Sequence, residues 1–137
     1  MQKKDRILSI DYGLKNVGVA YTDEYHLSIN YLPNLLNNDR LVEEILKIIK
    51  LYNINLILVG YPNFKDNFES EFKEHLNKFY ILLKEKTNLN VIKVDESNTT
   101  EESYKLINEF QIKKNKKKQM KDSISAGLIL KNYLDKI

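Results

Sequence analysis

Residues 7–20 read ILSIDYGLKNVGVA, and this stretch decides the fold. It begins with a mostly apolar run that ends in the carboxylate of Asp11, which is typical of a central strand. Gly13 can take a positive φ at a tight turn, and the run from Val17 starts a second strand. Gly18 and Ala20 leave room on that second strand for another group to come close. We therefore expect a hairpin whose first strand ends in an acid.

Asp11 has two interpretations at this stage. A buried aspartate is costly unless it is paired, hydrogen-bonded or bound to a cation, and a strand end beside a bare backbone suits a metal ion or a phosphate. An aspartate close to a glycine is also common turn chemistry, in which the carboxylate caps its own loop. This stretch alone favours neither interpretation, so the rest of the chain has to decide.

Composition limits the possible kinds of site. The chain has 137 residues, 42% of them hydrophobic and 30% charged, which fits one globular domain over residues 1–137. It has no cysteine and two histidines, so a bound metal would be a hard cation held by oxygens, such as Mg²⁺ or Mn²⁺. No apolar run is long enough to span a bilayer, and the start, MQKKDR, lacks a signal-peptide core. We expect a cytoplasmic protein without a membrane partner.

Hydrophobic periodicity predicts an α/β fold. Expected strands cover residues 7–11, 17–22, 27–32, 56–60 and 91–96, and expected helices cover residues 41–52, 68–86, 99–110 and 120–134, with a loop at 34–39. The first three strands form an antiparallel meander, and right-handed crossovers place the last two parallel to the first. The prediction is a mixed five-stranded sheet of order 3-2-1-4-5, with strand 2 antiparallel and helices on both faces.

Carboxylates gather at one predicted edge of this sheet. Asp11 ends the first strand, Asp95 and Glu96 end the fifth, and Asp122 falls in the first turn of the last helix. Asp122 alone is better explained as a helix cap or a partner of the helix dipole. Three carboxylates together repel one another unless a cation joins them, and two metal ions held in this way can drive phosphodiester hydrolysis. The set therefore indicates a metal-dependent phosphodiesterase.

Lysines accompany the acids and indicate a polyanionic partner. Those expected to contact nucleic acid are Lys15, Lys113, Lys114, Lys116, Lys117, Lys118 and Lys121. A run of like charges is usually a solvated loop. We expect a mobile loop before the last helix that becomes ordered on nucleic acid.

At these residues the chain resembles the YqgF/RuvX family of RNase H-like nucleases. The resemblance lies in four motifs, carried by Asp11, Gly13, Lys15, Gly18 and Ala20; by Gly60-Tyr61-Pro62; by Asp95-Glu96-Ser97-Asn98-Thr99-Thr100; and by Asp122, Ser125, Ala126, Ile129 and Leu130. Two positions depart from the family pattern: Ser97 replaces an arginine, and Tyr61 replaces a leucine. The first departure removes a phosphate or structural contact, which leaves substrate preference open.

The resemblance implies a three-layer RNase H-like fold and a Mg²⁺ or Mn²⁺ site formed by Asp11, Glu96 and Asp122. The choice of Glu96 over Asp95 rests on the resemblance alone. The implied activity is endonucleolytic 5′-end maturation of 16S ribosomal RNA precursor, on RNA or on a ribosomal particle, by a monomer or a homodimer.

Three other functions remain as alternatives. A Holliday junction resolvase acting on branched DNA would need two active sites and hence a dimer. Actin-like ATPases also begin with an Asp-x-Gly hairpin, but they need two such lobes. A non-catalytic RNA-binding assembly factor would gain nothing from mutually repelling carboxylates beside phosphates.

Overall fold

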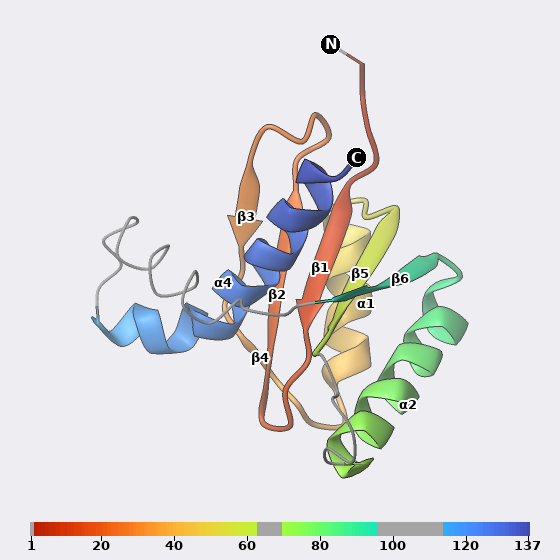
Figure 1. The fold of residues 1–137 in the computed structure, drawn as a ribbon, viewed down its shortest axis with the longest axis vertical. Coiled ribbons are helices and arrows are strands. Elements are labelled where there is room, and N and C mark those ends of the chain that lie inside the picture. The colour runs from red at the N-terminus through yellow and green to blue at the C-terminus, as the bar shows by residue number, and fades with distance from the viewer. Residues whose placement is uncertain (1, 63–69, 96–113) are drawn as a thin grey trace.

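The computed structural model describes residues 2–62, 70–95 and 114–137. Its elements are β1 Ile7–Asp11, β2 Asn16–Thr22, β3 Ile29–Tyr31, β4 Leu35–Leu36, α1 Leu41–Leu51, β5 Leu56–Tyr61, α2 Ser70–Thr87, β6 Asn90–Asp95 and α4 Lys114–Asp135 (Figure 1). The helix expected over 99–110 lies outside the described residues, as do Glu96, Ser97 and Lys113.

The sheet has the predicted strand order. Its path is β3-β2-β1-β5-β6, which corresponds to the expected order 3-2-1-4-5. β1 pairs antiparallel with β2 and parallel with β5, and β5 pairs parallel with β6. The carboxyl ends of β1, β5 and β6 therefore meet at one edge of the sheet, where open α/β sheets bind their ligands.

A sixth strand, β4, was not predicted, because its residues were expected to form a loop. The third strand is also shorter than expected, and Pro33 follows close behind it. Proline has no N–H to donate to a ladder, so the pairing with β2 is interrupted at this point. It resumes two residues later, where Leu35 and Leu36 lie opposite Val17 and Asn16. β2 is thus paired along one side by two short strands with a gap between them.

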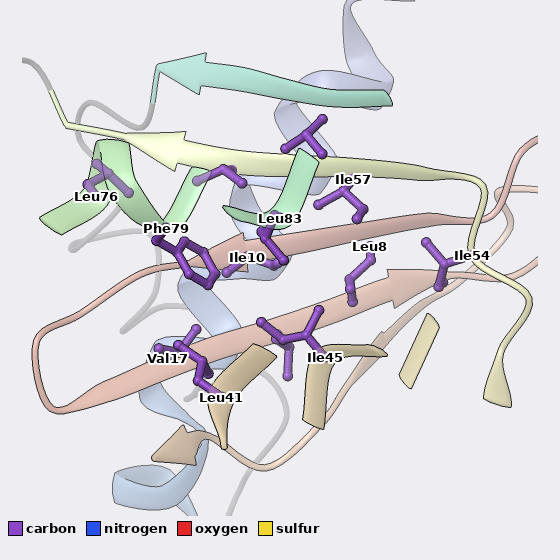
Figure 2. Close-up of a cluster of buried hydrophobic side chains, with 13 residues drawn as sticks. Leu8, Ile10, Val17, Leu41, Ile45, Ile54, Ile57, Leu76, Phe79 and Leu83 are labelled. Carbon is purple, nitrogen blue, oxygen red and sulfur yellow. The ribbon is translucent and has the colours of Figure 1, made fainter. Parts of the chain in front are cut away.

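The face of the sheet behind β1 in Figure 1 carries the larger hydrophobic core, which is covered by α1 and α2. The apolar spacing of α1 places Leu41 and Ile45 against the sheet, and Asn53, at φ 54°, follows where the helix has ended. Figure 2 shows these side chains in one cluster with Phe79 and Leu83 of α2, in front of the strands. This core fixes the β-strands from one side only.

The opposite face is covered by α4, which completes a three-layer arrangement. Ile129 and Leu130 of α4 pack against Ile7, Leu56 and Leu58 of the sheet. The three layers and the mixed sheet are those of the RNase H-like fold, as expected. Among the described residues, no helix is both long and apolar enough to cross a membrane.

The beginning of α4 corrects two expectations. The helix was expected from residue 120, but its described part begins at Lys114. Lys114, Lys116, Lys117 and Lys118 therefore belong to a helix and not to a mobile loop, in agreement with the good helix propensity of lysine. Asp122 lies about two turns inside α4, so it cannot be a helix cap or a first-turn partner of the helix dipole.

Candidate active site

Asp11 faces the α4 layer. Side chains alternate along a strand, and Ile7 of β1 packs against α4 whereas Leu8 and Ile10 lie in the core on the other face. By this alternation Asp11 shares the α4 face with Ile7 and Ser9, and its side chain is half-buried. Its partner across the antiparallel ladder is Gly18 of β2.

Gly18 allows α4 to lie directly on the sheet beside Asp11. A Cβ atom at Gly18 would stand 1.9 Å from the carbonyl oxygen of Asp122 and 2.5 Å from the backbone nitrogen of Ser123. Gly18 does leave space beside the second strand, as expected. The backbone of α4 fills this space, and not a metal ion or a phosphate. Asp11 and Asp122 are thus brought to neighbouring positions on one face of the sheet.

Gly13, in the turn between β1 and β2, has a different role from the one expected. No glycine among the described residues has a positive φ. A Cβ atom at Gly13 would instead lie 2.4 Å from the carbonyl oxygen of Asn16, so glycine is needed here for close packing of the turn. The turn is also held from outside, because the Asn37 amide donates to the Gly13 carbonyl at 2.7 Å.

Asp122 is held by a hydrogen-bond network that the sequence does not predict. The side-chain nitrogen Nδ2 of Asn34 donates to Oδ2 of Asp122 at 3.3 Å. Oδ1 of Asn34 accepts from both the backbone N–H and the hydroxyl of Ser123, each at 3.1 Å. The Ser123 hydroxyl in turn accepts from the backbone N–H of Val19 at 3.0 Å. Asn34 and Ser123 are 89 residues apart, and no local pattern in the sequence joins them.

The electrostatic environment of Asp122 favours a cation. Burial raises the pKa of the Asp122 carboxyl above its ordinary value, and the neighbouring Lys121 partly opposes that rise. Burial acts by removing water from the charged form, and a bound cation would restore the lost stabilisation. A half-buried carboxylate beside a second carboxylate, in a chain without cysteine, fits a hard divalent cation held by oxygens.

Asp95 does not share the face of the other two acids. Val91 lies in the core with α2, whereas Ile92 and Val94 lie on the α4 side. Asp95 therefore points to the α2 side, away from Asp11. This strand geometry argues against Asp95 as the third ligand. Within residues 2–62, 70–95 and 114–137 no group of three acids or histidines is assembled, and Glu96 lies outside these ranges.

Tyr61, which departs from the family pattern, also lies on the face away from the acids. Its hydroxyl donates to Oδ1 of Asn77 in α2 at 3.1 Å, and its ring meets that of Tyr80 edge-on at 6.0 Å. Burial, with a smaller contribution from Tyr80, raises the pKa of Tyr61 to about 12. The departure therefore affects packing against α2. Gly60, one residue earlier, adds no side chain on the Asp11 face.

The lysines are divided between two places. Lys15 is exposed in the turn that directly follows β1, and its carbonyl accepts from the Asn37 backbone N–H at 2.9 Å. Lys121 is exposed on α4 directly before Asp122. Positions 114, 117, 118 and 121 recur at helical spacing on α4, whereas position 116 falls on another side of the helix. In Figure 1 these early turns of α4 extend beyond the sheet.

A cavity at the opposite end of the sheet is separate from the acids. It measures about 620 Å³ and lies between the N-terminal segment and the end of α4, with Lys4, Ile7, His26, Leu56, Lys131 and Tyr133 among its lining residues. These residues lie near the amino ends of β1 and β5. The cavity therefore adds nothing to a site at the carboxyl ends.

Comparison with known proteins places the chain in a family. A family model described as "RuvX: Holliday junction resolvase" matches residues 5–136. A relative from Ruminiclostridium cellulolyticum, "Putative pre-16S rRNA nuclease", is 36% identical over 135 residues, covering 96% of this chain and 95% of the relative. A relative of the same name from a Sulfurihydrogenibium species is 36% identical over 134 residues, covering 96% of this chain and 91% of the relative.

Solved structures agree on the fold. The structure "T. thermophilus RuvC in complex with Holliday junction substrate" matches with a TM-score of 0.65 at 12% identity and covers 96% of this chain and 95% of that one. The fowlpox virus resolvase in its complex with Holliday junction DNA matches with a TM-score of 0.56 at 17% identity, covering 94% and 98%. Because the family model spans nearly the whole chain and curated relatives reach 36% identity along it, the chain belongs to the RuvX family.

Proposed function

We propose that this protein is a metal-dependent endonuclease that processes the 5′ end of 16S ribosomal RNA precursor in the cytoplasm. The observation that carries the proposal is the convergence of Asp11 and Asp122 on one face of the sheet, through Gly18. The third ligand in this proposal is Glu96. The substrate is proposed from the names of the curated relatives, which the chain matches over almost its whole length.

The residues of this chain have separate tasks in the proposed reaction. Asp11, at the end of a central strand, and Asp122, held by Asn34, would be ligands of Mg²⁺ or Mn²⁺. The ion, when bound, supplies an activated water and stabilises the leaving oxygen. Both acids are half-buried, so less water competes for the cation than at an open surface. Lys15, exposed in the turn that follows the Asp11 strand, and Lys121, exposed one residue before Asp122, would contact the phosphates that flank the scissile bond.

The early turns of α4 would bind the RNA backbone. Positions 114, 117, 118 and 121, which we call the lysine stripe, lead along the helix toward Asp122. Cations spaced along a helix attract a polyanion and release its condensed counterions. Lys113 and Lys116 add positive charge to the same segment of the chain. The stripe thus guides the substrate toward the acids without reading its sequence.

A second candidate function is cleavage of four-way DNA junctions. It is favoured by the description of the family model and by the fold shared with resolvases solved on junction DNA. Symmetric cleavage of a junction needs two active sites, so this function would require a homodimer.

The deciding experiment compares cleavage of a 5′-extended 16S RNA fragment, free and within a ribosomal particle, with cleavage of a four-way DNA junction. Each substrate is incubated with Mn²⁺ and with chelator. Asp11→Asn should lower the cleavage rate by more than the ~10- to 100-fold that loss of an outer-shell partner costs, because a metal ligand itself is lost. Asp135→Asn is the matched control, since this exposed acid lies at the far end of α4 and should leave the rate unchanged.

Each outcome separates the candidates. Metal-dependent cleavage of RNA that Asp11→Asn abolishes supports the proposal. Paired nicks in the junction, with intact RNA, would replace it by the resolvase. Binding of RNA without cleavage in any form, free or in the particle, would point to an assembly factor without catalytic activity.

A further inference from the structure

We infer that Asn34 is a positioning residue that holds the Asp122 carboxylate in place for a divalent cation. The inference rests on the proposed metal-dependent function and deepens it. It assigns a role to a residue that lies neither on an acid-bearing strand nor on α4. The neutral amide of Asn34 is its only polar group apart from the backbone.

The contacts of Asn34 fix the direction of its amide. Oδ1 accepts from two groups of Ser123, its backbone N–H and its hydroxyl. An amide oxygen accepts and an amide nitrogen donates, so only one orientation satisfies both Ser123 donors. In that orientation Nδ2 is directed at Oδ2 of Asp122. The contacts of Oδ1 with Ser123 thus ensure that a donor, Nδ2, faces Asp122.

Asn34 is itself placed by the gap between β3 and β4. The Leu32 N–H donates to the Val19 carbonyl at 3.2 Å, at the last point where β2 pairs with the end of β3. The Val19 N–H falls in the gap and donates to the Ser123 hydroxyl instead of a strand. Pro33 spans this gap and limits the backbone just before Asn34. The anchor of Asp122 is therefore built into the sheet.

A neutral donor suits a metal ligand better than a charged one. A lysine in this position would also hydrogen-bond the carboxylate, but its charge would offset the attraction for a cation. The Asn34 amide occupies one lone pair of Oδ2 and leaves the other oxygen of the carboxylate for the ion. Hydrogen bonds of this kind fix the orientation of metal-binding side chains, and their removal lowers metal affinity.

The experiment measures Mn²⁺ binding by calorimetry, without substrate, in the wild type and three variants of the full chain. Asn34→Ala should weaken Mn²⁺ binding by about 10- to 100-fold. Asn55→Ala is the matched control, because Asn55 also makes a side-chain hydrogen bond, from the Arg6 N–H at 3.0 Å, but lies at the far end of the sheet. Asp122→Asn reports on the metal site itself.

The results separate this inference from the function on which it rests. Mn²⁺ binding that Asp122→Asn abolishes and Asn34→Ala weakens, with Asn55→Ala unchanged, supports the inference. If Asp122→Asn loses Mn²⁺ binding but Asn34→Ala binds Mn²⁺ with wild-type affinity, the inference is overturned and the proposed function is not. Equal binding by wild type and Asp122→Asn would overturn the proposed metal site first.

Asn34→Asp tests a premise of the inference, that the cation lies beside the contact between Asn34 and Asp122, and it does not depend on Asn34→Ala folding well. It keeps the shape of the side chain and an acceptor for both Ser123 donors, and it replaces only the group that faces Asp122. Two carboxylates would then meet, and a cation between them would relieve their repulsion. Mn²⁺ should therefore raise the melting temperature of Asn34→Asp more than that of the wild type. An equal rise in both proteins would show that the cation is not held beside Asn34.

Discussion

Asp122 is an acidic residue in a place where burial disfavours negative charge. It is half-buried on an inward side of α4, and burial raises the pKa of its carboxyl. An ionised carboxylate in this position costs folding free energy, which an ordinary structural residue would avoid. Acids with raised pKa values gather at functional sites, where the strained charge is available for a ligand.

The first consequence concerns stability without metal. Because the folded-state pKa of Asp122 is raised, the folded protein binds more protons than the unfolded chain just above the ordinary pKa. Stability is therefore lost as pH rises through this window. Asp122→Asn removes the loss, and it should raise the free energy of unfolding at pH 7 in chelator while abolishing cleavage.

Urea unfolding between pH 3 and pH 7 measures this effect. The stability difference between Asp122→Asn and the wild type should be small below the ordinary aspartate pKa and should grow as pH rises. A difference that stays constant with pH would contradict the argument.

At the scale of elements, the site depends on the direct contact between β2 and α4. The close approach at Gly18 places the backbones in contact, and no flexible side chain lies between them to absorb a change. Element packing of this kind tolerates added volume poorly. The position of Asp122 is thus set by the absence of one methyl group on the neighbouring strand.

Gly18→Ala should therefore destabilise the protein by about 3 kcal/mol or more and should also weaken metal binding. Gly127→Ala is a matched control on the same helix. A Cβ there would meet the ring of Tyr31 at 2.3 Å, and a ring can turn where a helix backbone cannot. Chemical denaturation should place Gly18→Ala well below Gly127→Ala in stability, and the reverse order would refute this account.

The lysine stripe gives a prediction at the same scale. Replacing Lys114, Lys117 and Lys118 by glutamine should weaken binding to single-stranded RNA and reduce the slope of log K against log salt by about 2, since each phosphate contact contributes about 0.7. The control is Lys116→Gln, on another side of α4. Equal loss of slope per lysine in both variants would show that the helical face does not matter.

At the scale of the whole molecule, the strand order and the Asp11 strand end were predictable from local patterns. The sheet order followed from apolar runs and from the handedness of crossovers, both of which depend on near neighbours in sequence. β4 was not predictable, because a two-residue strand has no periodicity. The beginning of α4 was missed because a run of lysines is compatible with both a helix and a loop.

The hydrogen bond that holds Asp122 in place could not be predicted, for a different reason. Asn34 and Asp122 are 88 residues apart, and their contact exists only after the sheet and α4 have packed together. The side of the sheet to which Asp95 points could be assigned only once the register of β6 against β5 was known. Local sequence thus identified the candidate acids, and tertiary packing determined how two of them are arranged.

A prediction for the whole chain follows from the three layers. Ending the chain at residue 113 removes α4 and leaves Ile7, Leu56 and Leu58 without the side chains that cover them. We expect this fragment to lack cooperative thermal unfolding and to bind hydrophobic dyes. A fragment that unfolds with the sharp transition of the full chain would show that α4 is dispensable for folding.

The hydrogen bond between Val19 and Ser123 also has a consequence for synthesis. The two residues are separated by 104 positions, so β2 leaves the ribosome long before its partner on α4 is made. At about 5–20 residues per second, the delay is about 5–20 s. Asp122 reaches Asp11 only after the residues that separate them in the chain have been synthesised. A growing chain that has not yet reached residue 122 therefore lacks one of the three proposed metal ligands, and we expect it to have no cleavage activity.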